Sequence, residues 1–505
     1  MTFREVLSPG EERFERRRKA LGYFLAPLVF IVLYFAPLGT LADRPQKLAA
    51  VLGLVIVFWL TETIPLAVAA ILGAVLNVLL GVAPAREVFA PFAHPLVFLF
   101  IGSFILAEAI TQHGLDRRFA FTIFSIRFLQ KSPARVLFAF GLIVAVVSMW
   151  ISNTASTAMM LPIALGVLAA MKDLHGDSGG YDFNKFSTAM MLMVAYGASV
   201  GGIATPIGTP PNVIGLGMIN ELIGVRITFY EWMVFALPIT AVMFIFLFIT
   251  LGSGRAFKRA RLIGIDAFME KARNDLGPWK RGEINTAFCF AVAVFLWILP
   301  SIAGLALGKE AELAKLLTER LNTGVVAVFA ATLLFLMPVS FKKAEFTMGW
   351  RRASRIDWGT ILLFGGGLSL GSLMFSTGLA DFMGKALTGA TGASSLWGIT
   401  AIGTALAIIL SETTSNTASA NMIIPVMIAI AQGAGVSALP PALGATLGAS
   451  FGFMLPVSTP PNAIVYGSGL VPILSMVRKG VIFDIGGFFI IVFGVMGLTT
   501  LLGWA

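Results

Sequence analysis

The 505-residue sequence is poor in cysteine, histidine and charge, and each shortage excludes a class of function. The single cysteine, Cys289, lies in an apolar run and excludes a disulfide framework or a cysteine-based metal site. The three histidines (His94, His113 and His175) are not spaced as a ligand pair. The sequence also lacks HExxH and GxxxxGK[ST] motifs, paired aspartates and a Ser/His pair at membrane depth. Neither an intramembrane enzyme nor an ATP-driven pump is indicated, and no cofactor is expected.

Charged residues make up only 12% of the chain, whereas 57% of its residues are hydrophobic. Soluble globular proteins are about a quarter charged, so this composition indicates a chain solvated mainly by lipid. The net charge of +10 does not indicate a nucleic-acid partner, because the basic residues occur in short clusters between apolar runs. Such clusters are typical of the cytoplasmic loops of membrane proteins.

A helix needs about 20 apolar residues to cross the hydrocarbon layer of a membrane. Eleven segments qualify, at 21–41, 47–61, 64–83, 94–112, 185–217, 229–252, 284–306, 321–340, 358–378, 441–470 and 480–503. The first follows a basic cluster at 16–19 and is too long for a signal peptide, whose apolar region is about 7–15 residues. The sequence therefore predicts a multi-pass protein of the inner membrane whose residues 1–20 form a cytoplasmic tail.

The loops alternate in charge along the predicted spans. Segments 114–135, 253–281 and 341–357 are rich in Arg and Lys, whereas segment 307–320 carries both signs. The positive-inside rule then predicts a cytoplasmic N-terminus and an external C-terminus. The predicted parts are the tail 1–20, a first membrane half 21–252, a cytoplasmic linker 253–283 and a second half 284–505. A hydrophilic, glycine-rich segment at 172–184 is interpreted as a loop insertion.

The two halves repeat the same motifs in the same order. SNTASTAMMLPI at 152–163 matches SNTASANMIIPV at 415–426, and TPIGTPPN at 205–212 matches LPVSTPPN at 455–462. Phe100-Ile101-Gly102 likewise corresponds to Phe364-Gly365-Gly366. The predicted topology enters the first SNT segment from the cytoplasm and the second from outside. Matching elements of opposite orientation form an inverted repeat, which is common in secondary transporters.

Each SNT triplet lies at the centre of an apolar stretch that is too long for one span. A single helix over 135–171 would be about 55 Å long, against about 30 Å for the hydrocarbon core. Hydropathy alone permits two crossings joined by an aqueous turn, or a re-entrant hairpin with its tip at mid-membrane. The apolar residues directly flanking the triplet favour hairpins at about 135–171 and 396–432, because polar backbone at that depth must line a cavity or be buried in protein. Ordinary hydrogen bonding between helices is the alternative role for these Ser and Thr residues.

The two TPPN segments interrupt apolar spans. Two consecutive prolines remove two backbone donors and cannot continue a helix. A broken helix leaves free carbonyls for a cation and free N–H groups for an anion. Since no Arg or Lys lies in the apolar spans beside these motifs, we expect an anion to be held by hydroxyls, amides and helix ends, with bound cations neutralising it.

Three acidic residues lie near or within predicted spans: Glu62, Glu108 and Glu412. Carboxylates in a membrane are candidates for function by default. Glu62 and Glu412 adjoin polar turns, which favours a structural role for both.

These motifs resemble those of the divalent anion/sodium symporter (DASS) family, which includes di- and tricarboxylate carriers, and within it the bacterial sodium/dicarboxylate transporters. The resemblance rests on both SNT triplets, both TPPN segments and the segment WLTETIP at 59–65, and it covers the chain after about residue 20. It implies an all-α fold of eleven transmembrane helices with two re-entrant hairpins, a homodimer and an elevator-type transport mechanism.

The resemblance also assigns site residues. The first sodium site would comprise Ser148, Ser152, Asn153 and Gly208, and the second Ser411, Thr414, Ser415, Asn416 and Ser458. The residues that would bind substrate carboxylates are Asn153, Thr154 and Thr209 from the first half and Asn416, Thr417 and Thr459 from the second, with Pro210 and Pro460 lining the site.

The function predicted from these features is import of a C4-dicarboxylate, such as succinate, malate or fumarate, coupled to sodium. Within the same family, sodium-independent dicarboxylate exchange and carriage of citrate, 2-oxoglutarate or sulfate are alternatives. A passive channel is less consistent with paired broken helices, which suit alternating access.

Overall fold

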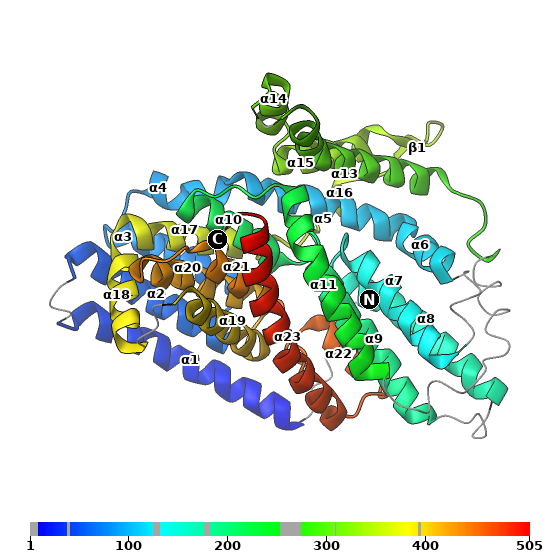
Figure 1. Ribbon diagram of the computed structural model, residues 1–505, viewed down its shortest axis with the longest axis horizontal. Helices are drawn as coiled ribbons and strands as arrows, with labels where there is room; N and C mark the ends of the chain where they lie inside the picture. The colour runs from blue at the N-terminus through cyan, green and yellow to red at the C-terminus, as the bar shows by residue number, and fades with distance from the viewer. Residues whose placement is uncertain are drawn as a thin grey trace.

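The computed structural model describes residues 9–37, 41–124, 132–175, 182–252, 274–308, 310–391 and 395–504. In these segments the chain is almost entirely helical, and the helices pack into one elongated body (Figure 1). Within the described residues there is one sheet, a two-stranded antiparallel ribbon. Strand β1 (Pro338–Ser340) directly precedes the predicted loop 341–357, and β2 (Glu345–Phe346) lies within it. The all-helical, multi-pass fold predicted from the sequence is confirmed.

The first half contains eleven α-helices and a short 3-10 helix within the described residues. Their bounds are α1 Pro9–Phe35, α2 Asp43–Thr61, α3 Leu66–Leu79, α4 Ala85–Phe89, η1 Ala90–Ala93, α5 Pro95–His113, α6 Leu115–Phe124, α7 Pro133–Ser148, α8 Asn153–His175, α9 Phe183–Gly202, α10 Pro210–Ile223 and α11 Phe229–Gly252.

The second half follows the same order. Its helices are α13 Arg281–Leu307, α14 Glu312–Arg320, α15 Thr323–Leu336, α16 Trp350–Ala353, α17 Trp358–Ser376, α18 Leu379–Thr391, α19 Leu396–Thr413, α20 Asn416–Gly433, α21 Leu439–Gly448, α22 Pro460–Tyr466 and α23 Ile473–Leu501. The pair α19 and α20 corresponds to α7 and α8, and α21 and α22 correspond to α9 and α10.

Two predicted non-helical segments are helical in the structure. Helix α1 begins at Pro9, inside the predicted tail, because its polar first turns are stabilised by contacts such as Arg18 with Glu15 at 3.0 Å. Helix α14 occupies most of the predicted loop 307–320 and meets α15 at a bend of 62°. Most of the linker 253–283 and the centre of the segment 172–184 lie outside the described residues.

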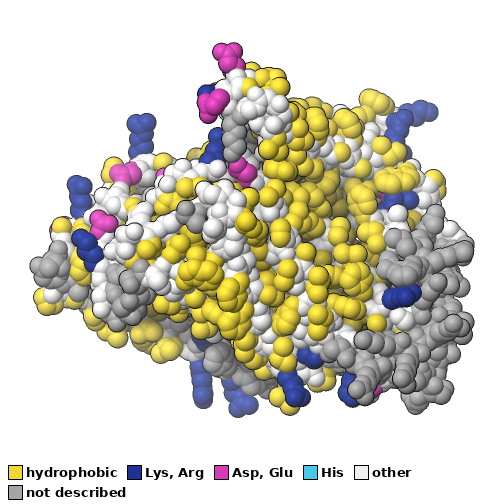
Figure 2. Space-filling view, in the orientation of Figure 1, with side chains coloured by type: hydrophobic (Ala, Val, Ile, Leu, Met, Phe, Trp, Pro, Cys, Tyr) yellow, Lys and Arg dark blue, Asp and Glu magenta, His cyan; other side chains and the backbone are white. Residues whose placement is uncertain are grey.

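Nine helices in the described part of the chain are long and apolar enough to cross a membrane, or ten if α14 and α15 form one span. On the visible face, hydrophobic side chains spread across the middle, and Lys and Arg lie mainly toward the edges (Figure 2). Burial of such a surface in lipid is expected for a multi-pass membrane protein.

The two halves interlock through reciprocal helix contacts. Helix α3 of the first half packs on α17 of the second, and α15 of the second half packs on α5 of the first. Both contacts use the glycines noted in the repeat: a Cβ at Gly102 would overlap the backbone of Ala327, and one at Gly366 would lie 2.6 Å from Cβ of Ala70. Only glycine allows the helix axes to approach this closely.

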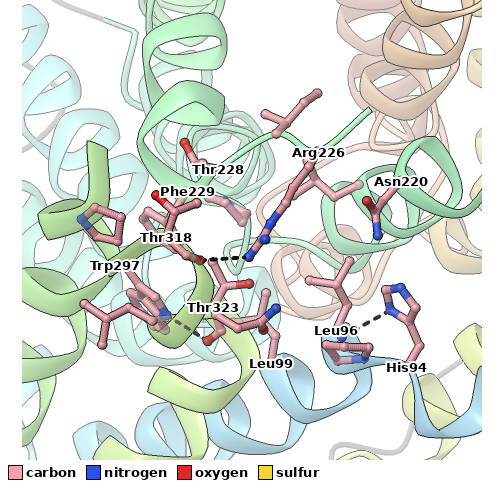
Figure 3. Close-up of a pocket in the computed structure, with 17 residues that line it drawn as sticks. His94, Leu96, Leu99, Asn220, Arg226, Thr228, Phe229, Trp297, Thr318 and Thr323 are labelled. Atoms are coloured by element: carbon pink, nitrogen blue, oxygen red, sulfur yellow. Dashed lines mark hydrogen bonds between the residues drawn. The ribbon is translucent and has the colours of Figure 1, made fainter. Parts of the chain in front are cut away.

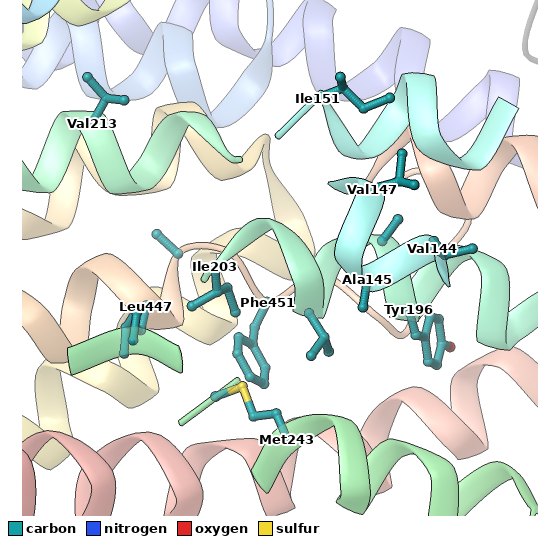
Figure 4. Packing of buried hydrophobic residues seen from close by; sticks show 14 of the residues in the cluster. Val144, Ala145, Val147, Ile151, Tyr196, Ile203, Val213, Met243, Leu447 and Phe451 are labelled. Atoms are coloured by element: carbon teal, nitrogen blue, oxygen red, sulfur yellow. The ribbon is translucent and has the colours of Figure 1, made fainter. Parts of the chain in front are cut away.

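A continuous apolar core joins the hairpins to the broken helices. Val144 and Val147 of α7, Met243 of α11, and Phe451 beyond α21 are among its buried members (Figure 4). Because this core draws on both halves, it holds the two hairpin tips and the two breaks in one rigid arrangement.

Candidate functional site

The two hairpin tips have the same local structure. Helix α7 ends at Ser148 and α8 begins at Asn153, while α19 ends at Thr413 and α20 begins at Asn416. At the first tip, the Ser148 hydroxyl donates to Oδ1 of Asn153 at 2.7 Å. At the second, the Ser411 hydroxyl donates to Oδ1 of Asn416 at 2.8 Å. The sequence repeat is therefore also a repeat of geometry.

The TPPN segments begin helices rather than interrupting them. Thr209 and Thr459 are the N-cap residues, and the two prolines that follow each of them occupy the first turn of α10 and α22. Proline is tolerated there, because the N–H groups of a first turn have no partner within the helix. The breaks lie upstream, between Gly202 and Thr209 and between Gly448 and Thr459.

An asparagine braces each break from inside. Nδ2 of Asn212 donates to the carbonyls of Gly202 at 3.0 Å, Ile203 at 3.1 Å and Thr205 at 2.7 Å. In the second half, Nδ2 of Asn462 donates to the carbonyls of Gly452 at 2.9 Å and Leu455 at 3.0 Å. Both asparagines are fully buried. They satisfy carbonyls of the irregular backbone inside the protein, where water is scarce.

The two tips and the two first turns line one open cavity of about 690 Å³, together with residues of α5 and α17. All eight residues predicted to bind substrate line it: Asn153, Thr154, Thr209, Pro210, Asn416, Thr417, Thr459 and Pro460. Residues from four segments far apart in the sequence are thus brought to one place.

The residues predicted to bind cations fall into two groups. Ser152, Asn153, Gly208, Ser415, Asn416 and Ser458 also line the cavity. Ser148, Ser411 and Thr414 lie behind the tips and are almost completely buried. Each predicted cation site therefore lies between the cavity and the protein interior.

Helix ends contribute partial charges to the cavity between the tips. Helices α8, α10 and α20 begin at Asn153, Pro210 and Asn416, all of which line the cavity. Helix N-termini carry partial positive charge and free N–H groups, which favour an anion. The C-terminal ends of α7, α9, α19 and α21 meet the same tips and breaks from behind, and their carbonyls carry the opposite partial charge.

Two glycines bring the breaks against the tips. A Cβ on Gly202 would overlap Oδ1 of Asn153, and one on Gly452 would lie 3.2 Å from the carbonyl oxygen of Ser411. Neither these glycines nor Asn212 and Asn462 were predicted as functional from the sequence. A sequence signal for them was available. Gly202 and Gly452, like Asn212 and Asn462, are separated by the same number of residues as the two TPPN segments.

The rim of the cavity carries charge that the motifs did not indicate. Glu108 of α5, Arg355 and Asp357 line it where α5 ends and α17 begins. Nε of Arg352 donates to Oε1 of Glu108 at 2.5 Å, linking α16 to α5. Arg355, the basic residue at the rim, is exposed and lies outside the tips. The sequences of the two tips contain no Arg or Lys.

Of the other two acidic candidates, Glu412 lies in the second tip region and Glu62 is linked to it through Arg18. Glu62 ends α2 in a left-handed conformation, with φ at 47°, and forms an ion pair with Arg18 at 3.2 Å. Arg18 also donates to the carbonyl of Thr413 at the end of α19, at 3.2 Å. Glu412 is buried and accepts hydrogen bonds from the backbone of Phe453 and from that of Met454, the latter at 2.9 Å.

A separate pocket of about 210 Å³ lies beyond the first broken helix (Figure 3). Arg226 and Asn220 line it, together with His94 and Trp297. Arg226 is held by the carbonyl of Thr318 at 3.3 Å. None of the predicted site residues lines this pocket, which therefore does not compete with the larger cavity as the candidate site.

Comparisons with known proteins agree with the fold and the motifs. The family model of the sodium:sulfate symporter transmembrane region matches residues 17–504. The chain is 34% identical over 467 residues to the sodium-dependent dicarboxylate transporter SdcS of Staphylococcus saprophyticus, covering 91% of this chain and 87% of the relative. It is 32% identical over 469 residues to SdcS of Staphylococcus aureus strain USA300, with the same coverage.

Among solved structures, the YdaH transporter of Alcanivorax borkumensis superposes with a TM-score of 0.54 over 82% of this chain and 86% of that chain. At 13% identity the likeness concerns the fold alone. Because the family model spans nearly the whole chain and a relative above 30% identity covers 91% of it, this protein belongs to the sodium:sulfate symporter (DASS) family and is a multi-pass membrane transporter rather than an enzyme.

Proposed function

We propose that the protein imports C4-dicarboxylates such as succinate, malate or fumarate together with sodium. The observation that carries the proposal is the convergence of three helix N-termini, without a buried Arg or Lys, on one cavity between the two SNT tips. The names of the staphylococcal relatives, sodium-dependent dicarboxylate transporters, support the same substrate class.

The substrate dianion would lie between the two tips. Asn153 and Thr154 at the start of α8 face it from one half, and Asn416 and Thr417 at the start of α20 from the other. Each tip offers amide and hydroxyl donors plus unpaired backbone N–H groups, which suits one carboxylate per tip. The hydroxyls of Thr209 and Thr459 would complete the two carboxylate subsites.

Sodium would occupy the oxygen-rich space behind each tip. Side-chain oxygens of Ser148 and Asn153, with backbone carbonyls of the adjacent break, would surround the first ion. Ser411, Asn416 and Ser458 would supply the matching oxygens of the second. Hard cations prefer oxygen ligands, and two positive charges beside a dianion reduce the cost of moving it through a low-dielectric interior.

Access would alternate between the two sides of the membrane. The cavity opens at the rim formed by Glu108 and Arg355, which the predicted topology places in the cytoplasm. We infer an inward-open state, from which the hairpins and broken helices would move as a unit toward the opposite side. Elevator movement, the homodimer and the membrane depth of the hairpin tips stay predictions from the family resemblance.

The test is uptake of radiolabelled succinate into proteoliposomes, with an inward sodium gradient compared with an equal potassium gradient. Vesicles are either empty or preloaded with unlabelled succinate. We expect uptake into empty vesicles that requires sodium. Protein-free vesicles control for leakage.

Each other outcome identifies an alternative. Uptake only into preloaded vesicles, indifferent to sodium, would make the protein an exchanger. Absence of succinate uptake in both arms would contradict the substrate, and citrate, 2-oxoglutarate and sulfate would be tested in the same format.

A further inference from the structure

The two halves differ chemically at one point behind the tips. Glu412 follows Ser411, whereas Met149 follows Ser148 in the first half. Ser458 likewise stands where the first half has Gly208. The second half therefore carries a carboxylate and a hydroxyl where its counterpart has a thioether and no side chain, and these two groups contact each other.

Glu412 is held in a fixed position by neutral donors. Its Oε1 accepts from the backbone N–H groups of Phe453 and Met454, and its Oε2 accepts from the Ser458 hydroxyl at 2.8 Å. The same hydroxyl lies 3.0 Å from the carbonyl oxygen of Glu412. The side chain is thus buried, oriented and held by hydrogen bonds rather than by an ion pair with any described Lys or Arg.

A second carboxylate adjoins the first without a partner of its own. Asp484 of α23 lies beside Glu412, is 6% exposed, and has no N–H or O–H donor among the other described residues for either carboxylate oxygen. Two ionised carboxylates cannot hydrogen-bond each other, since each only accepts, so the pair needs either a proton on one carboxyl or a cation between the two. Two ionised carboxylates buried side by side are costly in a low-dielectric interior unless a proton or a metal cation lies between them.

The groups around the pair do not supply that cation. Tyr196 of α9 faces both carboxylates and donates to the carbonyl of Phe453 at 2.5 Å (Figure 4 shows the Tyr196 ring at the edge of the apolar core). On α23 itself, Arg478 and Lys479 precede Asp484, and Nζ of Lys479 donates to the carbonyl of Thr250 at 2.6 Å. Helix α21, which also packs on α23, contains no charged residue, and the charged residue of α11, Glu231, lies near that helix's first turn.

We propose that Glu412 and Asp484 bind one dehydrated sodium ion between their carboxylates, at a site distinct from the two predicted tip sites. Asp484 offers two free oxygens and Glu412 its Oε2, which match the oxygen preference of a hard monovalent cation. Ser458 would connect this ion to the second tip site. Its hydroxyl donates to Glu412, and Ser458 is also a lining residue of the cavity. The inference rests on the proposed sodium coupling and adds one ion to it.

Sodium binding to purified protein in lipid nanodiscs tests the site without transport. Saturable binding of radioactive sodium is counted per chain for the wild type, Asp484→Asn and Asp381→Asn, the last being an exposed carboxylate on α18. We expect Asp484→Asn to lose one sodium ion per chain and Asp381→Asn to lose none. Equal counts for the wild type and Asp484→Asn would overturn the proposal and would leave a shared proton as the occupant. Absence of saturable sodium binding to the wild type would instead contradict the proposed sodium coupling.

Thermal unfolding gives a second readout that does not depend on counting. A ligand that binds only the folded state stabilises it in proportion to the logarithm of its concentration, once binding saturates. In choline chloride, Asp484→Asn and Asp484→Leu should melt at or above the wild-type temperature, because each removes an uncompensated buried charge. Both should gain less than the wild type when sodium chloride replaces choline chloride. A sodium-dependent gain equal to that of the wild type in both variants would contradict the site.

Discussion

The asparagine of each SNT triplet performs two tasks at once. Oδ1 of Asn153 accepts from Ser148 on the side of the predicted cation site, and the residue also lines the cavity. Asn416 has the same two relations through Ser411. A side chain that faces both ligands can link their binding, since occupancy on one side orients the group that serves the other.

Replacing either asparagine should therefore abolish transport without unfolding the protein. Asn153→Ala and Asn416→Ala each remove an oxygen from a predicted cation site and a donor from the cavity. Succinate uptake into proteoliposomes measures the loss, and Asn184→Ala, at an exposed position early in α9, is the matched control. Normal uptake by either tip variant would show that the site is assigned wrongly.

Gly202 tests how closely the first break must approach the first tip. Gly202→Ala would place a methyl group against Oδ1 of Asn153, and forced overpacking of this kind costs about 1–3 kcal/mol. Relative to the wild type, we expect the fold decrease in sodium affinity to exceed the fold decrease in the yield of folded protein. The reason is that the displaced atom belongs to the predicted cation site. Gly497→Ala on α23, where a Cβ meets no atom within 4 Å, should change neither. Unchanged sodium dependence in Gly202→Ala would contradict this role for the contact.

At the scale of elements, the broken helices depend on their internal braces. In the irregular backbone between Gly202 and Thr209, the Asn212 side chain donates to three carbonyls. The carbonyl of Ile203 also accepts from Nε1 of Trp232 at 3.2 Å, whereas that of Gly202 has no other donor among the described residues. Leaving a buried carbonyl without its donor lowers the free energy of unfolding by about 1–3 kcal/mol. The brace therefore fixes the direction in which α10 points its N-terminus at the cavity.

Asn212→Ala should weaken both stability and substrate binding. We expect a lower melting temperature in detergent and a higher succinate Michaelis constant, because the start of α10 loses its fixed position. Asn220→Ala lies on the same helix but faces the smaller pocket, and it should affect the Michaelis constant much less. If the two variants behaved alike, the brace would have no special role.

At the scale of the whole molecule, a buried ion pair joins the two halves outside the site. Nε and Nη2 of Arg118 on α6 donate to the two carboxylate oxygens of Glu283 on α13, at 3.1 and 3.0 Å. Arg118 also donates to the carbonyls of Leu276, Gly277 and Pro278 and lies over the Trp279 ring, with 4.8 Å from Cζ to the centroid. The end of the linker is thereby attached to the first half.

Removing this arginine should destabilise the protein while leaving the site intact. Arg118→Met would leave Glu283 buried without a counter-charge, which costs about 3–5 kcal/mol. We expect a clear drop in melting temperature, and unchanged sodium and succinate constants in the protein that remains folded. Arg117→Met, at the exposed neighbouring position, is the control. A melting temperature like that of the control would contradict the importance of the pair.

The motifs indicated where the chain turns and where helices start, because each of these features is local. A polar triplet between apolar runs favours a turn, and two consecutive prolines cannot continue a helix but are tolerated in its first turn. Residues such as Asn153 and Thr459 were therefore identifiable from the sequence. Arg355 at the rim and Asn212 in the brace were not, since their roles depend on contacts with other segments that no local pattern encodes.

The sequence by itself determined the class of protein, the order of its helices and the residues at both tips, because hydropathy and turn chemistry act over a few consecutive positions. Only the tertiary structure decided that three helix N-termini share one cavity, that α3 packs on α17 as α15 packs on α5, and that Asp484 lies beside Glu412. Those relations join residues tens to hundreds of positions apart. They arise from packing of whole helices, for which the single chain carries no readable local signal.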